Sequence, residues 1–125
     1  MVFEEGEGPR FTLLDASRGC KGDPADDVTA MAVNFVFFAI DRPASWANGL
    51  GPLWRRFWDV YLRGSGDRGL LEVAAPWLAW RCLVVCCPRF YPALPAGARD
   101  AILGLAERAL DAPRFDPCWA EELFP

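Results

Sequence analysis

The apolar positions of the chain divide it into a short N-terminal pair of strands and a longer helical part. Residues 1–3 form an apolar run, residues 4–9 have turn chemistry, and residues 10–14 alternate like a second strand that ends at Asp15. This pattern predicts a β-hairpin over residues 1–15. Since an isolated two-stranded hairpin is only marginally stable, we expect it to pack on the rest of the chain.

A long apolar segment follows, and it begins with strong helix-start signals. Asp23 is placed to cap a helix, Pro24 suits the first helical position, and acidic residues crowd the first turn. Residues 31–40 are apolar on every side of such a helix except at Asn34. A helix that is apolar all round is typical of a buried element. We therefore predict a buried helix over residues 23–41, with Asn34 as a hydrogen-bonded core amide.

The remainder of the chain has the spacing of three more helices. Apolar residues recur at helical spacing over 50–61 opposite a row of arginines, and a helix over about 70–87 contains Pro76 and stops before Pro88. A last helix over about 96–110 has an apolar face, whose residues are Ala98, Ile102, Leu105, Ala106 and Ala109. We expect a mainly α fold, in which a short hairpin is followed by about four helices. The units of this single domain, residues 1–125, are the hairpin 1–15, the buried helix 23–41, the helical region 50–111 and the tail 112–125, with one helical turn at 119–123.

Composition limits the chemistry that the chain can carry. The 125 residues are 53% hydrophobic, which suits one globular domain, and they contain no histidine. The lack of histidine excludes Ser-His-Asp and Cys-His mechanisms and histidine-ligated metals. A net charge of −4 gives no reason to expect nucleic-acid binding. The first ten residues are acidic, unlike a signal peptide, and charges and a proline interrupt the longest apolar stretch, so we expect a cytoplasmic protein with no membrane span.

Three residue types need a choice between a structural and a functional interpretation. The pattern Gly64-x-Gly66-x-x-Gly69 matches a dinucleotide-binding motif, but a helix rather than a strand precedes it, so we interpret it as an inter-helix turn. The six tryptophans are expected mostly in the core, and a tryptophan-lined ligand pocket is the alternative. The five cysteines are expected to be reduced and to act as small buried hydrophobes.

Two aspartates have both a structural and a chemical interpretation. Asp15 follows an apolar strand and enters a loop, where a carboxylate can either cap the turn or ligate Mg²⁺. Asp27 lies in the first helical turn, where it can balance the helix dipole or accept hydrogen bonds from the backbone amides of a neighbouring loop. From these residues alone, both alternatives stay open.

The order of these motifs resembles that of a known family. Leu13-Leu14-Asp15, a short loop and then Gly22-Asp23-Pro24-Ala25-Asp26-Asp27 are similar to the hydrophobic-I-D-[FW]-x…G-D-P-x-x-D-L-A pattern of the aminoglycoside phosphotransferase/choline kinase-like family. The resemblance covers about residues 1–35 and implies the C-terminal lobe of a protein kinase-like fold. It implies that Asp15 is the metal ligand, while Asp27 and Asp23 give structural support to a catalytic loop.

This resemblance also implies an activity, cofactors and partners. The family transfers a phosphoryl group from ATP, with Mg²⁺, to an alcohol of a small-molecule acceptor, whose site the helices from residue 50 onward are expected to shape. The family's nucleotide lysine and H-G-D-x-x-x-x-N loop have no counterpart in this sequence, whose one lysine is Lys21. We therefore expect a C-terminal lobe with no catalytic residue of its own, inactive alone, with an apolar face for a separately encoded N-lobe or for self-association. The alternatives are a non-enzymatic helical protein-interaction module and a tryptophan-lined ligand-binding bundle.

Overall fold

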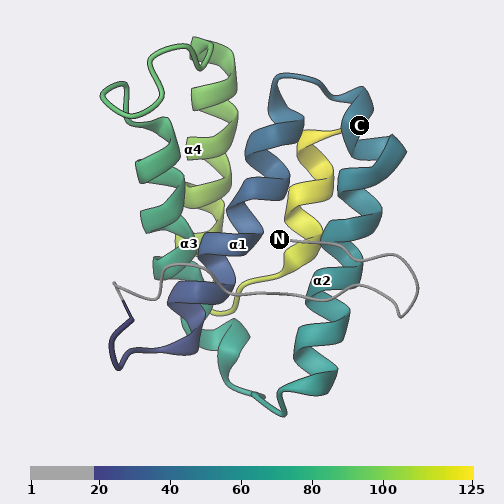
Figure 1. Cartoon of the computed structure of the whole chain (residues 1–125), viewed down its shortest axis with the longest axis vertical. Coiled ribbons are helices and arrows are strands. Elements are labelled where there is room, and N and C mark those ends of the chain that lie inside the picture. The colour runs from purple at the N-terminus through teal and green to yellow at the C-terminus, as the bar shows by residue number, and fades with distance from the viewer. Residues whose placement is uncertain (1–18) are drawn as a thin grey trace, which may run out of the picture.

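The computed structural model describes residues 19–125, and these residues are mainly helical (Figure 1). No strand occurs within this part of the chain, and the hairpin predicted at 1–15 lies outside the described residues, as does Asp15. Short π-helical (η1) and 3₁₀ (η2) segments accompany four α-helices. In chain order the elements are α1 (Pro24–Ile40), η1 (Trp46–Leu50), α2 (Gly51–Gly64), α3 (Leu70–Cys86), α4 (Ala96–Asp111) and η2 (Pro117–Leu123).

Helix α1 begins as its sequence predicts. Asp23 has an extended backbone, and its carboxylate accepts a hydrogen bond of 2.9 Å from the backbone N–H of Ala25, while Pro24 takes the first helical position. The buried hydroxyl of Thr29 donates to the carbonyl of Ala25 at 2.7 Å, so this buried polar group is satisfied within its own helix. Asn34 is hydrogen-bonded as predicted, through its amide N–H to the carbonyl of Ala30 at 2.8 Å, but it is half-buried rather than in the core.

Helix α3 lies in the centre of the fold, with α1 and α4 packed against it. Its side chains Leu78 and Cys82 are fully buried, and Ile102 of α4 is buried with them. The predicted apolar face of α4 is confirmed, because all five of its members are buried. Helix α3 continues through Pro76, which is exposed.

The C-terminal segment attaches α2 to the rest of the molecule. Phe115 is buried, its backbone N–H donates to the carbonyl of Leu71 at 2.8 Å, and its ring lies 5.4 Å from that of Trp58. The indole N–H of Trp54 donates to the carbonyl of Pro117 at 2.9 Å. The sequence indicated only a tail with one helical turn here, whereas η2 forms part of the core packing (Figure 1).

A second aromatic contact closes the same region. Trp46 of η1 stacks on Phe124, with 4.3 Å between the ring centroids, and its indole N–H donates to the Glu121 carboxylate at 3.0 Å. Gly51 lies so close to Trp46 that an added Cβ would come within 2.8 Å of the indole nitrogen, which explains why glycine begins α2. The aromatic residues therefore hold η1, α2 and η2 together.

Other predictions about residue types are confirmed in part. Trp46, Trp54 and Trp58 are buried as expected, but Trp80 is 55% exposed. The glycine-rich residues 64–69 join α2 to α3 as an inter-helix turn, and Gly66 adopts a positive φ of 69° that favours glycine. All five cysteines are free; two of them, Cys82 and Cys86, are buried, whereas Cys20 and Cys118 are exposed, contrary to the prediction.

The prediction that α1 is buried on all sides is wrong. Helix α3 covers the side that includes Val33 and Val36, but Met31 is 51% exposed and Phe38 is 62% exposed. The reason is that the described helices pack on one side of α1 only. Together with the neighbouring side of α2, the outer side of α1 forms a surface that we call the α1–α2 apolar face: Met31, Phe35, Phe38, Leu53, Phe57 and Val60.

The buried indole of Trp54 generates a stability prediction. Trp54→Phe removes the donor to the Pro117 carbonyl and leaves part of a packed site unfilled, so we expect a loss of roughly 1–3 kcal/mol in the free energy of unfolding, measured by urea denaturation. Trp80→Phe is the matched control, because the Trp80 side chain is largely exposed, and it should change stability by less than about 0.5 kcal/mol. Equal losses in the two variants would contradict the role of the C-terminal segment described here.

Candidate functional site

The predicted support residues lie where α1 begins and α2 ends. Phe35 of α1 packs against Phe57 of α2, with ring centroids 5.6 Å apart, and the two helices run in opposite directions. The start of α1 is therefore beside the end of α2 and the turn that follows it. We call this region the acidic end, and it consists of Asp23 and Asp27 from α1, Tyr61 from α2 and Asp67 from the inter-helix turn.

The pKa of the Tyr61 phenol reflects the negative charges of the acidic end. Burial raises its pKa above the ordinary value, and the negative charges of Asp67, Asp23 and Asp27 raise it further, while a hydrogen bond with Ser65 acts in the opposite direction. The three carboxylates, two at the start of α1 and one in the inter-helix turn, therefore act on the same phenol of α2. This convergence was not apparent in the sequence, where Asp67 belongs to a glycine-rich turn.

The two adjacent acids in the first turn of α1 have different surroundings. Asp26 forms an ion pair with Arg81 of α3, and both side chains are partly buried. Asp27, by contrast, is exposed. Arg81 was not predicted as a functional residue, although a lone arginine inside an apolar helix is itself a signal, because a partly buried charge needs a partner.

The described residues alone do not form a metal centre. Among residues 19–125, no group of three or more histidine, cysteine, aspartate or glutamate side chains has the arrangement to hold a metal ion. The carboxylate of Asp23 is already engaged in capping α1. Asp15, the predicted ligand of Mg²⁺, lies outside the described part of the chain.

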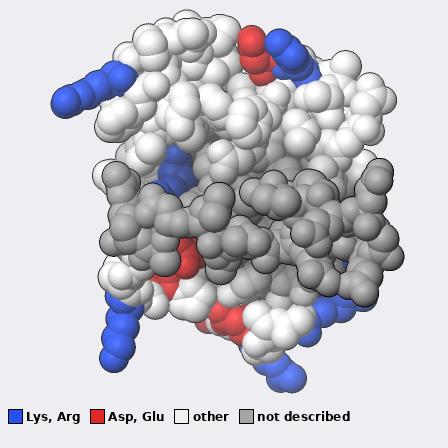
Figure 2. All heavy atoms as spheres, in the orientation of Figure 1, with Lys and Arg blue, Asp and Glu red and all other residues white. Residues whose placement is uncertain are grey.

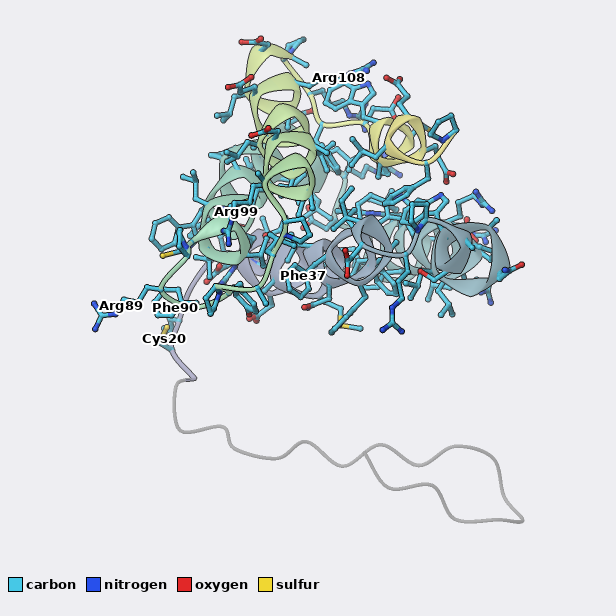
Figure 3. All side chains as sticks on the ribbon, turned by 90° about the horizontal axis from the view of Figure 1, so that it is seen from above. Cys20, Phe37, Arg89, Phe90, Arg99 and Arg108 are labelled. Carbon is cyan, nitrogen blue, oxygen red and sulfur yellow. The ribbon has the colours of Figure 1, made fainter. Side chains whose placement is uncertain are left out.

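A separate groove lies at the opposite end of α1. It has a volume of about 560 Å³, and its walls are the last turn of α1 and the loop between α3 and α4. Phe37 and Tyr91 meet edge-to-face in this region, with 4.8 Å between their centroids. Arg99 fixes the loop by donating to the carbonyls of Cys86 and Tyr91, the latter at 2.6 Å, and Figure 3 shows Phe37, Phe90 and Arg99 around this part of the molecule.

The length of α1 separates the groove from the acidic end. Helix α1 has 17 residues, which at 1.5 Å per residue is about 25 Å. A small molecule in the groove could not reach a phosphoryl group held at the acidic end. The expectation that the helices from residue 50 onward shape an acceptor site stays a prediction.

Comparisons with known proteins add no relative. No protein-family model, no curated protein and no solved structure matches this chain. The family resemblance of residues 1–35 therefore stays a prediction from its motifs. Within residues 19–125, none of the helices combines the length and the hydropathy needed to cross a bilayer.

The surroundings of Tyr61 generate a titration prediction. In a Tyr91→Phe background, which leaves Tyr61 as the only tyrosine, ultraviolet absorbance should give a phenol pKa above the ordinary value of about 10. Asp67→Asn should lower this pKa, because it removes a neighbouring negative charge. The matched control, Asp41→Asn at the far end of α1, should not change it.

The raised pKa of Tyr61 also determines whether the stability of the folded protein rises or falls with pH. Because the folded protein favours the neutral phenol, its contribution to stability is complete below about pH 10 and is lost as the pH rises through the folded-state pKa. Denaturant midpoints measured from pH 9 to pH 11 should therefore fall less steeply in Tyr61→Phe than in the parent. An Asp67→Asn titration identical to that of the parent would contradict the acidic end as described.

Proposed function

We propose that this chain forms the C-terminal lobe of an ATP-dependent phosphotransferase that acts on an alcohol group of a small molecule. The observation that carries the proposal is the start of α1: the Gly-Asp-Pro segment begins a capped helix whose first turn presents an exposed Asp27. In the family that residues 1–35 resemble, these residues follow the metal-binding aspartate, which corresponds here to Asp15. We also propose a cytoplasmic location.

The surroundings of the paired acids support Asp27, rather than Asp26, as the loop-supporting residue. The role requires a carboxylate that can accept hydrogen bonds from the backbone amides of another segment. The carboxylate of Asp26 is paired with Arg81. Asp27 is exposed, and its charge acts on Tyr61 at the acidic end. In this proposal Asp23 only fixes the start of the helix and so sets the position of Asp27.

The proposal assigns different tasks to this chain and to its partners. Asp15 holds Mg²⁺, which when bound neutralises charge on the phosphates during transfer. Asp27 orients the catalytic loop, and a separately encoded N-lobe supplies that loop, the general base and most nucleotide contacts. The acceptor is a small molecule with a free alcohol, and neither a membrane nor a nucleic acid takes part.

One observation favours a second candidate, a non-enzymatic helical interaction module. The α1–α2 apolar face leaves large hydrophobic side chains uncovered by the described helices, and exposed apolar patches mark binding surfaces for other proteins. In that case Asp15 and Asp27 have only local structural roles. A nucleotide-binding experiment separates the two candidates.

The phosphotransferase proposal predicts how the chain binds Mg²⁺-ATP in calorimetry. The chain alone should bind no nucleotide, and binding should appear when the polypeptide encoded immediately upstream is added. Asp15→Asn should abolish this binding, and Asp27→Asn should weaken it by about tenfold, the effect of losing one or two hydrogen bonds to a charged group.

Asp26→Asn provides the matched control for these variants. It removes a carboxylate next to Asp27 but breaks the pair with Arg81, so it should lower stability while leaving nucleotide affinity unchanged. Absence of binding with and without the upstream polypeptide, in a folded chain, would contradict the proposal and favour the interaction module. Magnesium- and ATP-dependent phosphorylation of an alcohol by the pure chain would contradict the assignment of the general base to a partner.

A further inference from the structure

The α1–α2 apolar face is large for a surface that faces water. Met31, Leu53 and Val60 are 51%, 54% and 48% exposed. Between the two helices the face contains a shallow groove of about 370 Å³, formed mainly by Phe35, Leu53, Phe57 and Val60. Figure 2, in the orientation of Figure 1, shows few charged side chains on the part of this side that is not drawn in grey.

We propose that residues 1–18 of the same chain cover the α1–α2 apolar face. This proposal concerns how the chain packs on itself, and it does not rest on the proposed phosphotransferase function. Its two supports are the length of chain that precedes the described residues, together with its point of attachment, and the match in apolar residues between the two surfaces.

The attachment point places residues 1–18 within reach of the face. The described chain starts at Gly19, four residues before the cap of α1 at Asp23. A strand over 10–14 spans about 17 Å at 3.3 Å per residue. The rise along α1 from Pro24 to Phe35 is also about 17 Å. A strand that ends near the start of α1 and runs along the helix therefore reaches Phe35 and the groove beside it.

The side chains of the two surfaces match in type. In the strand expected over 10–14, Phe11 and Leu13 point to the same side, because side chains alternate along a strand. This apolar side suits a groove between Phe35 and Phe57. Burial of such side chains is the main source of favourable energy in packing of this kind.

Attachment also favours residues 1–18 over a second copy of the chain. A segment joined by a short connection has an effective concentration in the millimolar range at a nearby surface. A second molecule would have to reach that concentration in solution to compete. We therefore assign the face to the chain's own N-terminal segment.

Photo-crosslinking of the full chain tests this assignment. A benzophenone-bearing phenylalanine analogue replaces Phe11, and in a separate variant Leu13, and the products of irradiation are sized and mapped by mass spectrometry. We expect a product of monomer mass, crosslinked within residues 31–38 or 53–60, from both positions.

Two matched variants show whether the crosslink depends on the face. Leu53 and Leu83 are both 54% exposed, but Leu53 is on the face and Leu83 is on α3. In the Phe11 analogue background, Leu53→Gln should reduce the ratio of docked to undocked chain by about tenfold, the effect of losing one buried leucine. Leu83→Gln should leave it unchanged.

Three results would overturn the proposal. A product of dimer mass would assign the face to a second copy, and a crosslink mapped to the groove at 90–95 would place the segment elsewhere. Equal crosslinking in the Leu53→Gln and Leu83→Gln variants would show that the apolar face does not hold the segment.

Discussion

Helix α1 has large apolar side chains on all of its sides, whereas α3 packs on only one side of it, and the rest of the structure depends on this difference. The covered side forms the core with α3 and α4. The uncovered side, with the adjoining side of α2, leaves Phe38 62% exposed and Leu53 54% exposed. Complete burial of a side chain of this size contributes about 1.5–3 kcal/mol, and these side chains are about half exposed, so covering the face would recover part of that free energy at each of them. The acidic end and the groove then lie at opposite ends of the same helix.

Polar groups fix how the helices are joined at their apolar surfaces. The Asp26–Arg81 pair ties the first turn of α1 to α3, and the Trp54 indole ties α2 to the first residue of η2. In both cases a polar atom lies inside an apolar contact between two elements. Any other packing of these elements that left this atom buried without its partner would carry a desolvation penalty, so few other arrangements are favourable. The same pairing leaves Asp27, rather than Asp26, exposed at the acidic end, and so connects the fold to the proposed function.

The sequence predicted those features that depend on neighbouring residues. Asp23 and Pro24 mark the start of α1, and the spacing of Ala98 to Ala109 marks the buried face of α4, since caps and periodicity act within one or two turns. It could not predict contacts between distant segments, such as Trp54 with Pro117 or Asp26 with Arg81. The burial of α1 was predicted wrongly for the same reason: apolar composition shows which sides can be buried, but the neighbours decide which sides are.

If residues outside the described helices cover the α1–α2 apolar face, the side chains of this face are protected from water in the full chain. Hydroxyl-radical footprinting of the full chain tests it directly, because two pairs of identical side chains have nearly equal exposure in residues 19–125. Phe38 and Phe90 are 62% and 63% exposed, and Leu53 and Leu83 are both 54% exposed. We expect Phe38 and Leu53 to be oxidised several-fold more slowly than Phe90 and Leu83. Equal rates within each pair would show that the α1–α2 apolar face is open to water and that no segment covers it.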